Sequence, residues 1–181
     1  SMSNEKLNDV VAMCDAIIES AKFDLSDPYL SKFYPENGPH IKDFIYAMPY
    51  DRETQHGMTY SRFWTHRTAN NDFYGVNLPN SVGGNMVYNP DFVDKFSLEG
   101  DVRNETILKG PLYVRDPATY KATSTPWMVN GVQVTLTREI DLLDMQTLDV
   151  GNDLKGRSQG YRSIKFYMDL RTTKAQSRNQ S

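Results

Sequence analysis

Apolar residues recur at a helical spacing over residues 6–22, and the pattern is longest there. The apolar positions lie three and four residues apart along this segment: Leu7, Val10, Val11, Cys14, Ile17, Ile18 and Ala21. The spacing predicts one amphipathic helix with a wide apolar face. Because no second helix of similar length and amphipathicity follows, we expect the partner of this face to lie outside the chain.

The rest of the chain is predicted to form short elements separated by turn residues. Asn89-Pro90-Asp91 is typical of a helix start, so a helix is expected from residue 90 to about residue 96. Residues 51–88 are expected to be mostly loop, with at most a short helix around residues 60–66. The polar residues 171–181 have no apolar anchor and are predicted to be frayed. Short strands are expected at residues 43–50, 106–108, 112–115, 133–136 and 163–167.

The composition indicates a folded chain with a small aliphatic core. Leu, Ile, Val and Phe make up 40 of the 181 residues, whereas 21 aromatic residues and a net charge of −3 favour folding over disorder. The near-neutral charge argues against nucleic acid as a partner. The sequence has no apolar run that could form a transmembrane segment, and its first residues lack a signal-peptide pattern. The single cysteine, Cys14, excludes an intrachain disulfide.

Two segments and their order suggest a family. The first is Ile45-Tyr46-Ala47-Met48-Pro49-Tyr50-Asp51, and the second is Gly160-Tyr161-Arg162-Ser163-Ile164-Lys165-Phe166-Tyr167. Between them lie the helix start at Pro90 and Gly100-Asp101, and the amphipathic helix precedes both. This succession, over nearly all of residues 7–170, resembles the SusD/RagB-like family, the surface glycan-binding lipoproteins of Bacteroidetes-type bacteria.

The resemblance implies a mainly α-helical fold in which tetratricopeptide-like helix pairs pack against an irregular part with loops and short strands. Residues 1–181 would then be a single partial domain without the family's N-terminal helical repeats and C-terminal helices. Residues 6–22 would be a scaffold helix, residues 23–170 the irregular loop-rich part and residues 171–181 a tail. The resemblance also implies a lipid-anchored parent protein at the outer membrane and cell surface. Its partners would be an oligosaccharide or polysaccharide and a TonB-dependent, SusC-like transporter.

Candidate ligand-binding residues cluster in a poorly periodic part of the chain. A carbohydrate site needs flat aromatic faces for the apolar faces of sugar rings and polar groups for the hydroxyls. The predicted ligand-binding residues, chosen for this chemistry, are Trp64, Tyr60, Tyr74, Arg62 and Asn71. Packing of Trp64 in the core is the alternative. Trp127 lies beside apolar neighbours and is predicted to be a core residue.

No catalytic or metal-binding pattern stands out. The three histidines are scattered, so neither a metal site nor a cofactor is predicted. Glu139 with Asp141 or Asp144 could mimic the carboxylate pair of a glycoside hydrolase, but the alternating apolar residues favour a solvated face. The sequence therefore predicts a non-enzymatic glycan-binding protein. The alternatives are a related binder of a non-glycan or glycoprotein-derived ligand, and a glycoside hydrolase.

Overall fold

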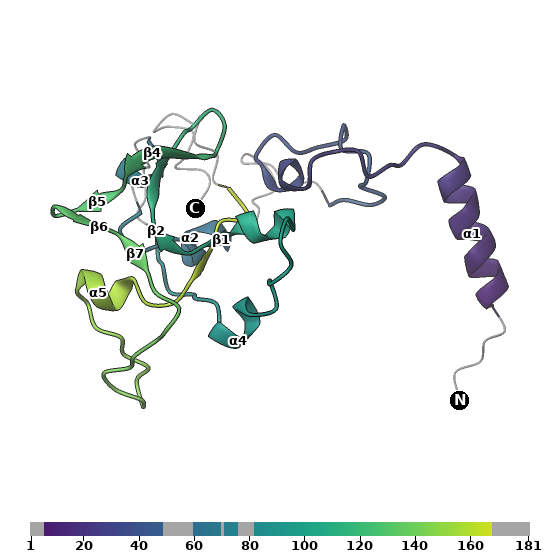
Figure 1. The fold of residues 1–181 in the computed structure, drawn as a ribbon. Coiled ribbons are helices and arrows are strands. Elements are labelled where there is room, and N and C mark those ends of the chain that lie inside the picture. The colour runs from purple at the N-terminus through teal and green to yellow at the C-terminus, as the bar shows by residue number, and fades with distance from the viewer. Residues whose placement is uncertain (1–5, 49–59, 70, 76–81, 168–181) are drawn as a thin grey trace.

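The first helix stands apart from the rest of the molecule. The structure, a computed structural model, describes residues 6–48, 60–69, 71–75 and 82–167 (Figure 1). The apolar period expected to form a helix at residues 6–22 forms α1 (Leu7–Glu19), which confirms that element. No residue of α1 is buried, and Val11 and Ile18 are 57 % and 73 % exposed. The apolar face of α1 is therefore not covered by the described part of the chain.

Residues 23–48 form a turn-rich segment between α1 and the body. Its short helix, η1 (Tyr29–Phe33), ends at Phe33, and the ring of Phe33 anchors the segment to the body. The Phe33 ring packs edge-on against Phe166 with centroids 5.2 Å apart, and Lys165 Nζ lies 4.4 Å from the Phe33 centroid. The strand expected at residues 43–50 is not observed over residues 43–48, which form turns and bends, because no described segment pairs with them. Residues 49–50 lie outside the described residues.

The named strands of the described chain are two to five residues long and pair antiparallel in twos. β1 (Ile107–Leu108) pairs with β8 (Arg162–Ser163), and β2 (Gly110–Pro111) pairs with β7 (Thr135–Leu136). β3 (Tyr113–Arg115) pairs with β4 (Ala122–Pro126), and β5 (Met128–Val129) pairs with β6 (Val132–Gln133). The pairings are nested. The β3–β4 and β5–β6 hairpins are enclosed by β2–β7, and β1–β8 encloses all of them.

Three buried residues between the strands tie the small sheets together. The backbone N–H of Leu112 donates to the carbonyl oxygen of Val134 at 2.8 Å, and that of Val134 donates to the carbonyl oxygen of Trp127 at 3.0 Å. The N–H of Trp127 donates in turn to the carbonyl oxygen of Leu112 at 3.0 Å. This ring of three bonds makes the hairpins one unit. At the end of the β5–β6 hairpin, Asn130 and Gly131 have φ values of 50° and 78°, as a type I′ turn requires.

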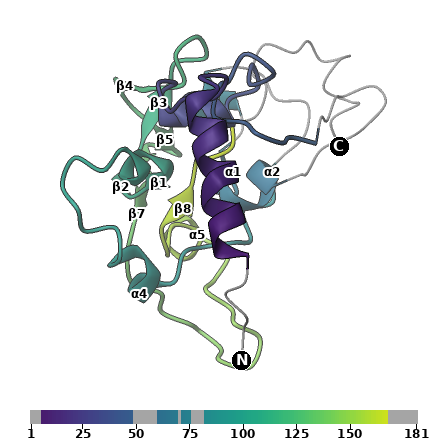
Figure 2. The same ribbon diagram turned by 90° about the vertical axis from the view of Figure 1, so that its right-hand side faces the viewer.

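Short helices flank the strands, and several begin with a side-chain cap. The side chain of Asn89 accepts a hydrogen bond from the N–H of Asp91 at the start of α4 (Pro90–Val93), as predicted, although the helix ends before residue 96. Asp101 and Asp153 cap η2 (Val102–Thr106) and α5 (Leu154–Arg157) in the same way. Two further short helices in the described part of the chain are α2 (Tyr60–Trp64) and α3 (Asn71–Tyr74). Seen from the side of α1, β8 lies in the middle of the body between β1 and α2 (Figure 2).

The core lies between these helices and the strands. Trp127 is 1 % exposed, which confirms its predicted place in the core. Its indole ring lies 4.8 Å from the Phe73 ring and 5.4 Å from the imidazole of His66, measured between centroids. Aromatic rings therefore fill much of the volume that the small aliphatic inventory leaves open.

The prediction of a mainly α-helical, tetratricopeptide-like fold is wrong. Among the described residues, α1 is the only helix longer than five residues, and the strands lie in small antiparallel sheets. That fold was implied by the family resemblance, not by the apolar pattern. Strands of two residues are too short to show an alternation of apolar and polar positions, so little in the local pattern contradicted it. The prediction also took that one helix as the start of a helical scaffold, but no described helix packs against it. In the described chain, no helix has the length and apolar character needed to cross a bilayer.

Candidate functional site

Four aromatic side chains form a continuous row, here termed the aromatic row: Trp64, Tyr88, Phe92 and Phe96. The ring centroids of Trp64 and Tyr88 are 4.7 Å apart, and those of Tyr88 and Phe92 are 5.3 Å apart. Tyr88 and Phe92 are stacked, with an angle of 25° between their planes. Phe96 continues the row by an edge contact with Phe92 at 5.2 Å. The row joins the end of α2 to α4 and the turn that follows it.

The aromatic row is open to solvent at α4. Phe92 is 46 % exposed, and the other three rings are partly buried. Because Tyr88 stacks on Phe92, the exposed ring is held in place by a second ring. A fixed, flat, half-exposed ring offers an apolar surface from which water is readily displaced. The row can therefore stack against the apolar face of a flat ligand ring.

Backbone hydrogen bonds hold the two halves of the row together. The N–H groups of Gly83 and Met86 donate to the carbonyl oxygens of Arg62 and Phe63, at 2.8 and 3.0 Å. Gly84 lies between them with a φ of +64°, and a Cβ there would be 2.5 Å from the backbone N of Arg67. Only glycine fits this close approach without a shift of the backbone. The segment that leads to Tyr88 is thus fixed against α2.

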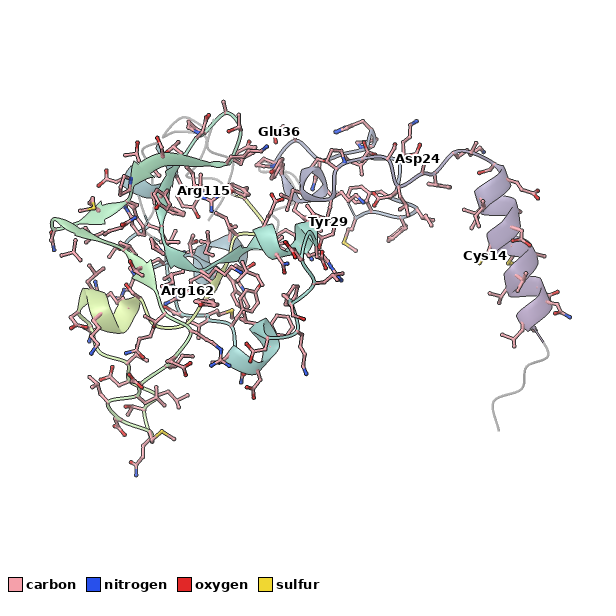
Figure 3. All side chains as sticks on the ribbon, in the orientation of Figure 1. Cys14, Asp24, Tyr29, Glu36, Arg115 and Arg162 are labelled. Carbon is pink, nitrogen blue, oxygen red and sulfur yellow. The ribbon has the colours of Figure 1, made fainter. Side chains whose placement is uncertain are left out.

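Arg162, on β8, holds the same segment from inside the molecule (Figure 3). Its Nη1 donates to the carbonyl oxygens of Gly84 and Met86 at 2.7 and 3.0 Å, and its Nη2 donates to that of Arg157 at 2.9 Å. The Arg162 side chain is buried, and no ion pair to it is found among the described residues. Burial lowers the pKa of this guanidinium to about 10, so it remains charged at neutral pH. Carbonyl dipoles take the place of a counter-ion.

His66, just after α2, is buried beside Arg162 in its neutral form. Its Nδ1 accepts the backbone N–H of Thr68 at 3.2 Å, so the ring proton lies on Nε2, which is 3.2 Å from Ser158 Oγ. The Ser158 hydroxyl donates to the carbonyl oxygen of Leu154 at 2.6 Å. Burial, together with the positive charges of Arg162 and Arg157, lowers the pKa of His66 to about 4. The imidazole therefore links α2 to the residues after α5 as an uncharged structural group.

An exposed charged cluster accompanies the aromatic row. Asp94 lies between Phe92 and Phe96 in the sequence and accepts a hydrogen bond from Arg138 Nη2 at 2.7 Å. Arg138 Nη1 donates to Glu139 at 2.7 Å. The bond to Arg138 lowers the pKa of Asp94, and the two carboxylates raise the pKa of Arg138. Arg138 and the two carboxylates together present hydrogen-bond donors and acceptors that can bind hydroxyl groups of a ligand.

The structure separates the predicted ligand-binding residues. Trp64 lies at the end of the aromatic row, and Arg62 is exposed on α2. Tyr74 is 2 % exposed and packs edge-on against Phe73, so its ring lies in the core and cannot meet a ligand at the surface. The side chains of Tyr60 and Asn71 lie outside the described part of the structure.

Three members of the row did not figure among the predicted ligand-binding residues. Phe92 and Phe96 belong to the short helix predicted at residues 90–96, where their spacing suggested an apolar face. Tyr88 lies in a region expected to be loop. A signal was nevertheless present, because aromatic residues recur at positions 88, 92 and 96 around the helix start at Asn89 and Pro90.

The three acidic residues considered as hydrolase carboxylates are all exposed. Glu139 is paired with Arg138, and Asp144 accepts hydrogen bonds from the N–H of Gln146 and from Thr147 Oγ1, which lower its pKa. A glycoside hydrolase needs one carboxylic acid in surroundings that raise its pKa, so that it can donate a proton. The hydrogen bonds to exposed Asp144 act in the opposite direction.

Comparison of the chain with protein-family models, with curated proteins and with solved structures gave no significant match. The geometry of the aromatic row is therefore the main guide to the function of this protein.

Proposed function

We propose that this protein binds an oligosaccharide at the aromatic row without cleaving it. The observation that carries the proposal is the half-exposed Phe92 ring, held by a near-parallel stack on Tyr88 within a row that continues to Trp64 and Phe96. Sugar rings have one face of C–H groups and a rim of hydroxyls. They are therefore suited to a fixed aromatic surface flanked by hydrogen-bonding groups.

The proposed binding combines stacking with hydrogen bonds. The apolar face of a sugar ring lies on Phe92, where it displaces water from the aromatic surface. The half-buried Arg138 and the exposed carboxylates of Asp94 and Glu139 offer donors and acceptors for hydroxyls. Because only Phe92 of the four rings is exposed and the other three are partly buried, affinity comes from a few weak contacts and is expected to be modest.

The proposal keeps the ligand class and the biological setting that the sequence resemblance to the SusD/RagB-like family implies, although the mainly α-helical fold implied by the same resemblance is not observed in the described residues. In that setting the protein works at the cell surface, captures an oligosaccharide and passes it to a TonB-dependent outer-membrane transporter. A site of modest affinity suits such a transfer, because a ligand that is held weakly can be released to the transporter.

Binding is tested by affinity gel electrophoresis of the full chain in gels that contain soluble starch, xylan, mannan, laminarin or mixed-linkage β-glucan. At least one glycan is expected to retard the protein. Phe92→Ala is expected to weaken that binding about tenfold, because loss of one stacking contact costs about 1.4 kcal/mol. Since Phe92 is 46 % exposed, this substitution does not open the core.

Tyr113→Ala is the matched control, because Tyr113 is a similarly exposed aromatic residue (38 %) on β3, outside the aromatic row. The control is expected to bind like the wild type. Absence of retardation in every glycan, or equal retardation of wild type and Phe92→Ala, would contradict the proposal. Incubation with the bound glycan should release no new reducing ends. Cleavage that disappears in Glu139→Gln would instead support a glycoside hydrolase.

A further inference from the structure

We propose that Asn130 is a modification site, where spontaneous loss of the side-chain amide leaves an isoaspartate in the turn of the β5–β6 hairpin. Asparagine precedes glycine twice in the sequence, at Asn37-Gly38 and at Asn130-Gly131. Asparagine is a thermolabile residue, and a glycine that follows it has no side chain to shield its own backbone nitrogen. The surroundings of the two pairs differ in the structure, and the difference favours reaction at Asn130.

The reaction at Asn130 needs no reagent other than water. The backbone nitrogen of Gly131 attacks Cγ of Asn130 and closes a five-membered succinimide. The Cγ–Nδ2 bond breaks, and the proton of the attacking nitrogen leaves with the amide as ammonia. Water then opens the ring. Cleavage between the nitrogen and Cγ gives aspartate, whereas cleavage between the nitrogen and the backbone carbonyl carbon of residue 130 gives isoaspartate, in which the chain continues through the side chain.

The reacting groups at Asn130 are unrestrained. Asn130 is exposed, and neither its side chain nor the N–H of Gly131 makes a hydrogen bond within the part of the chain that the structure describes. A Cβ on Gly131 would have nothing within 4 Å, so the space beside this residue is open. The flanking Met128 and Val132 are 46 % and 58 % exposed. Little buried surface therefore opposes local opening of this hairpin, which lets the side chain rotate toward the nitrogen.

The same groups are held at Asn37. Its Nδ2 donates to the carbonyl oxygen of Lys32 at 2.6 Å, and its backbone N–H donates to the carbonyl oxygen of Tyr34 at 3.0 Å. The side-chain amide must break its hydrogen bond before Cγ can turn toward the nitrogen of Gly38, and this requirement lowers the population of reactive conformations. We therefore expect Asn130 to react well before Asn37 in the folded protein.

An isoaspartate at position 130 is expected to loosen the strands around Trp127. Isoaspartate adds one carbon atom to the backbone of a two-residue turn, and the length of that turn fixes the register of the hairpin. The pair of Met128 with Gln133 depends on this register. The hydrogen bond from the N–H of Val134 to the carbonyl oxygen of Trp127 follows directly after the pair. The modification therefore acts on the ring of three hydrogen bonds that unites the small sheets.

Incubation of the full chain at pH 8.5 and 37 °C, followed by peptide mapping in a mass spectrometer and enzymatic methylation of isoaspartate, tests the proposal. Asn130 is expected to gain about 1 Da, as replacement of an amide by a carboxylate requires, at least about ten times faster than Asn37. In urea the two rates should agree within about threefold, because unfolding removes the restraints on Asn37. An unmodified Asn130, equal rates in the folded protein, or a tenfold difference that persists in urea would overturn the proposal.

Two variants separate the effect of isoaspartate from that of the added charge. The modified wild-type fraction, isolated by ion exchange, is expected to unfold at a lower urea concentration than unmodified protein. Asn130→Gly keeps a glycine pair that suits a type I′ turn and lacks the amide, so incubation should leave its unfolding midpoint unchanged. Fresh Asn130→Asp carries the charge without the extra backbone carbon and should unfold near the unmodified wild type. An equal loss in incubated Asn130→Gly, or in fresh Asn130→Asp, would refute the role of isoaspartate.

Discussion

His66 is predicted to make the stability of this protein depend on pH between pH 8 and pH 5. In the folded protein its pKa is about 4, because the imidazole is buried and lies near the positive charges of Arg162 and Arg157. In the unfolded chain the same side chain is hydrated and titrates near pH 6.5. Between these two values the unfolded chain binds a proton that the folded protein excludes, so acidification favours unfolding.

The size of the effect follows from the two pKa values. The stability due to neutral His66 is fully present above pH 6.5 and is lost as the pH falls toward 4. The whole difference corresponds to about 3 kcal/mol, of which about 2 kcal/mol is already lost at pH 5 compared with pH 8. The carboxylates with lowered pKa values, such as Asp101, contribute little in this window because an aspartate in the unfolded chain titrates near 3.8.

Urea unfolding at pH 8 and at pH 5, followed by far-ultraviolet circular dichroism, measures the difference. With a urea dependence of about 2 kcal/mol per molar, the midpoint is expected to fall by about 1 M between the two pH values. His66→Gln is expected to be less stable at pH 8 but to lose most of this pH dependence. His40→Gln is the control, because His40 is exposed, and it should keep the wild-type dependence.

Two results would refute this reasoning. The first is a wild-type midpoint that is the same at pH 8 and pH 5. The second is a pH dependence in His66→Gln equal to that of the wild type. If the variant does not fold, nuclear magnetic resonance titration of the wild type decides the matter. An imidazole pKa near 6.5 for His66 would show that the buried ring accepts a proton without penalty.

Two further predictions concern the segment that leads to the aromatic row. Arg162→Met is expected to cost about 3–5 kcal/mol in chemical unfolding, because it leaves buried carbonyl oxygens without donors, and Arg162→Lys should recover only part of the loss. Gly84→Ala is expected to cost about 3 kcal/mol or more, since its Cβ would meet the backbone of Arg67 at 2.5 Å. Gly100→Ala should cost only about 1 kcal/mol, because Gly100 shares the positive φ but has nothing within 4 Å of its Cβ. Equal losses for the two glycines would show that backbone conformation, and not crowding, sets the cost.

The parts of the fold that the sequence predicts correctly are those with a local physical cause. α1 follows from an apolar period over four turns, and the start of α4 follows from the capping chemistry of Asn89 and Pro90. The strands expected at residues 106–108 and 112–115 are observed as β1 and β3, each one residue shorter, because β-branched and aromatic residues lie there between turn residues. The strand expected at residues 163–167 is shifted to Arg162–Ser163. Its position is set by pairing with Ile107 and Leu108, which no local pattern reveals.

The candidate site was predictable only in part for the same reason. Trp64 is suggested by its chemistry, but its neighbour Tyr88 is 24 residues away in the sequence. The two rings meet because the segment at residues 83–86 pairs with α2 and because Arg162 holds that segment from β8. Neither contact produces a periodic pattern of apolar residues in the sequence. Tyr74 illustrates the converse: an aromatic residue in a polar stretch looks like a surface residue, yet it fills the core.

The nested pairing of the strands sets an order in which the chain can acquire its native contacts. The β3–β4 and β5–β6 hairpins close short loops and can form as soon as residues 113–133 are available. The β1–β8 pair must join Ile107 to Ser163 and closes a much longer loop, so it forms late. Arg162 lies on β8, so its hydrogen bonds to Gly84 and Met86 form only when β8 takes its place. During synthesis from the N-terminus, the aromatic row is therefore completed only after residue 162 has left the ribosome, long after its own four residues have been made.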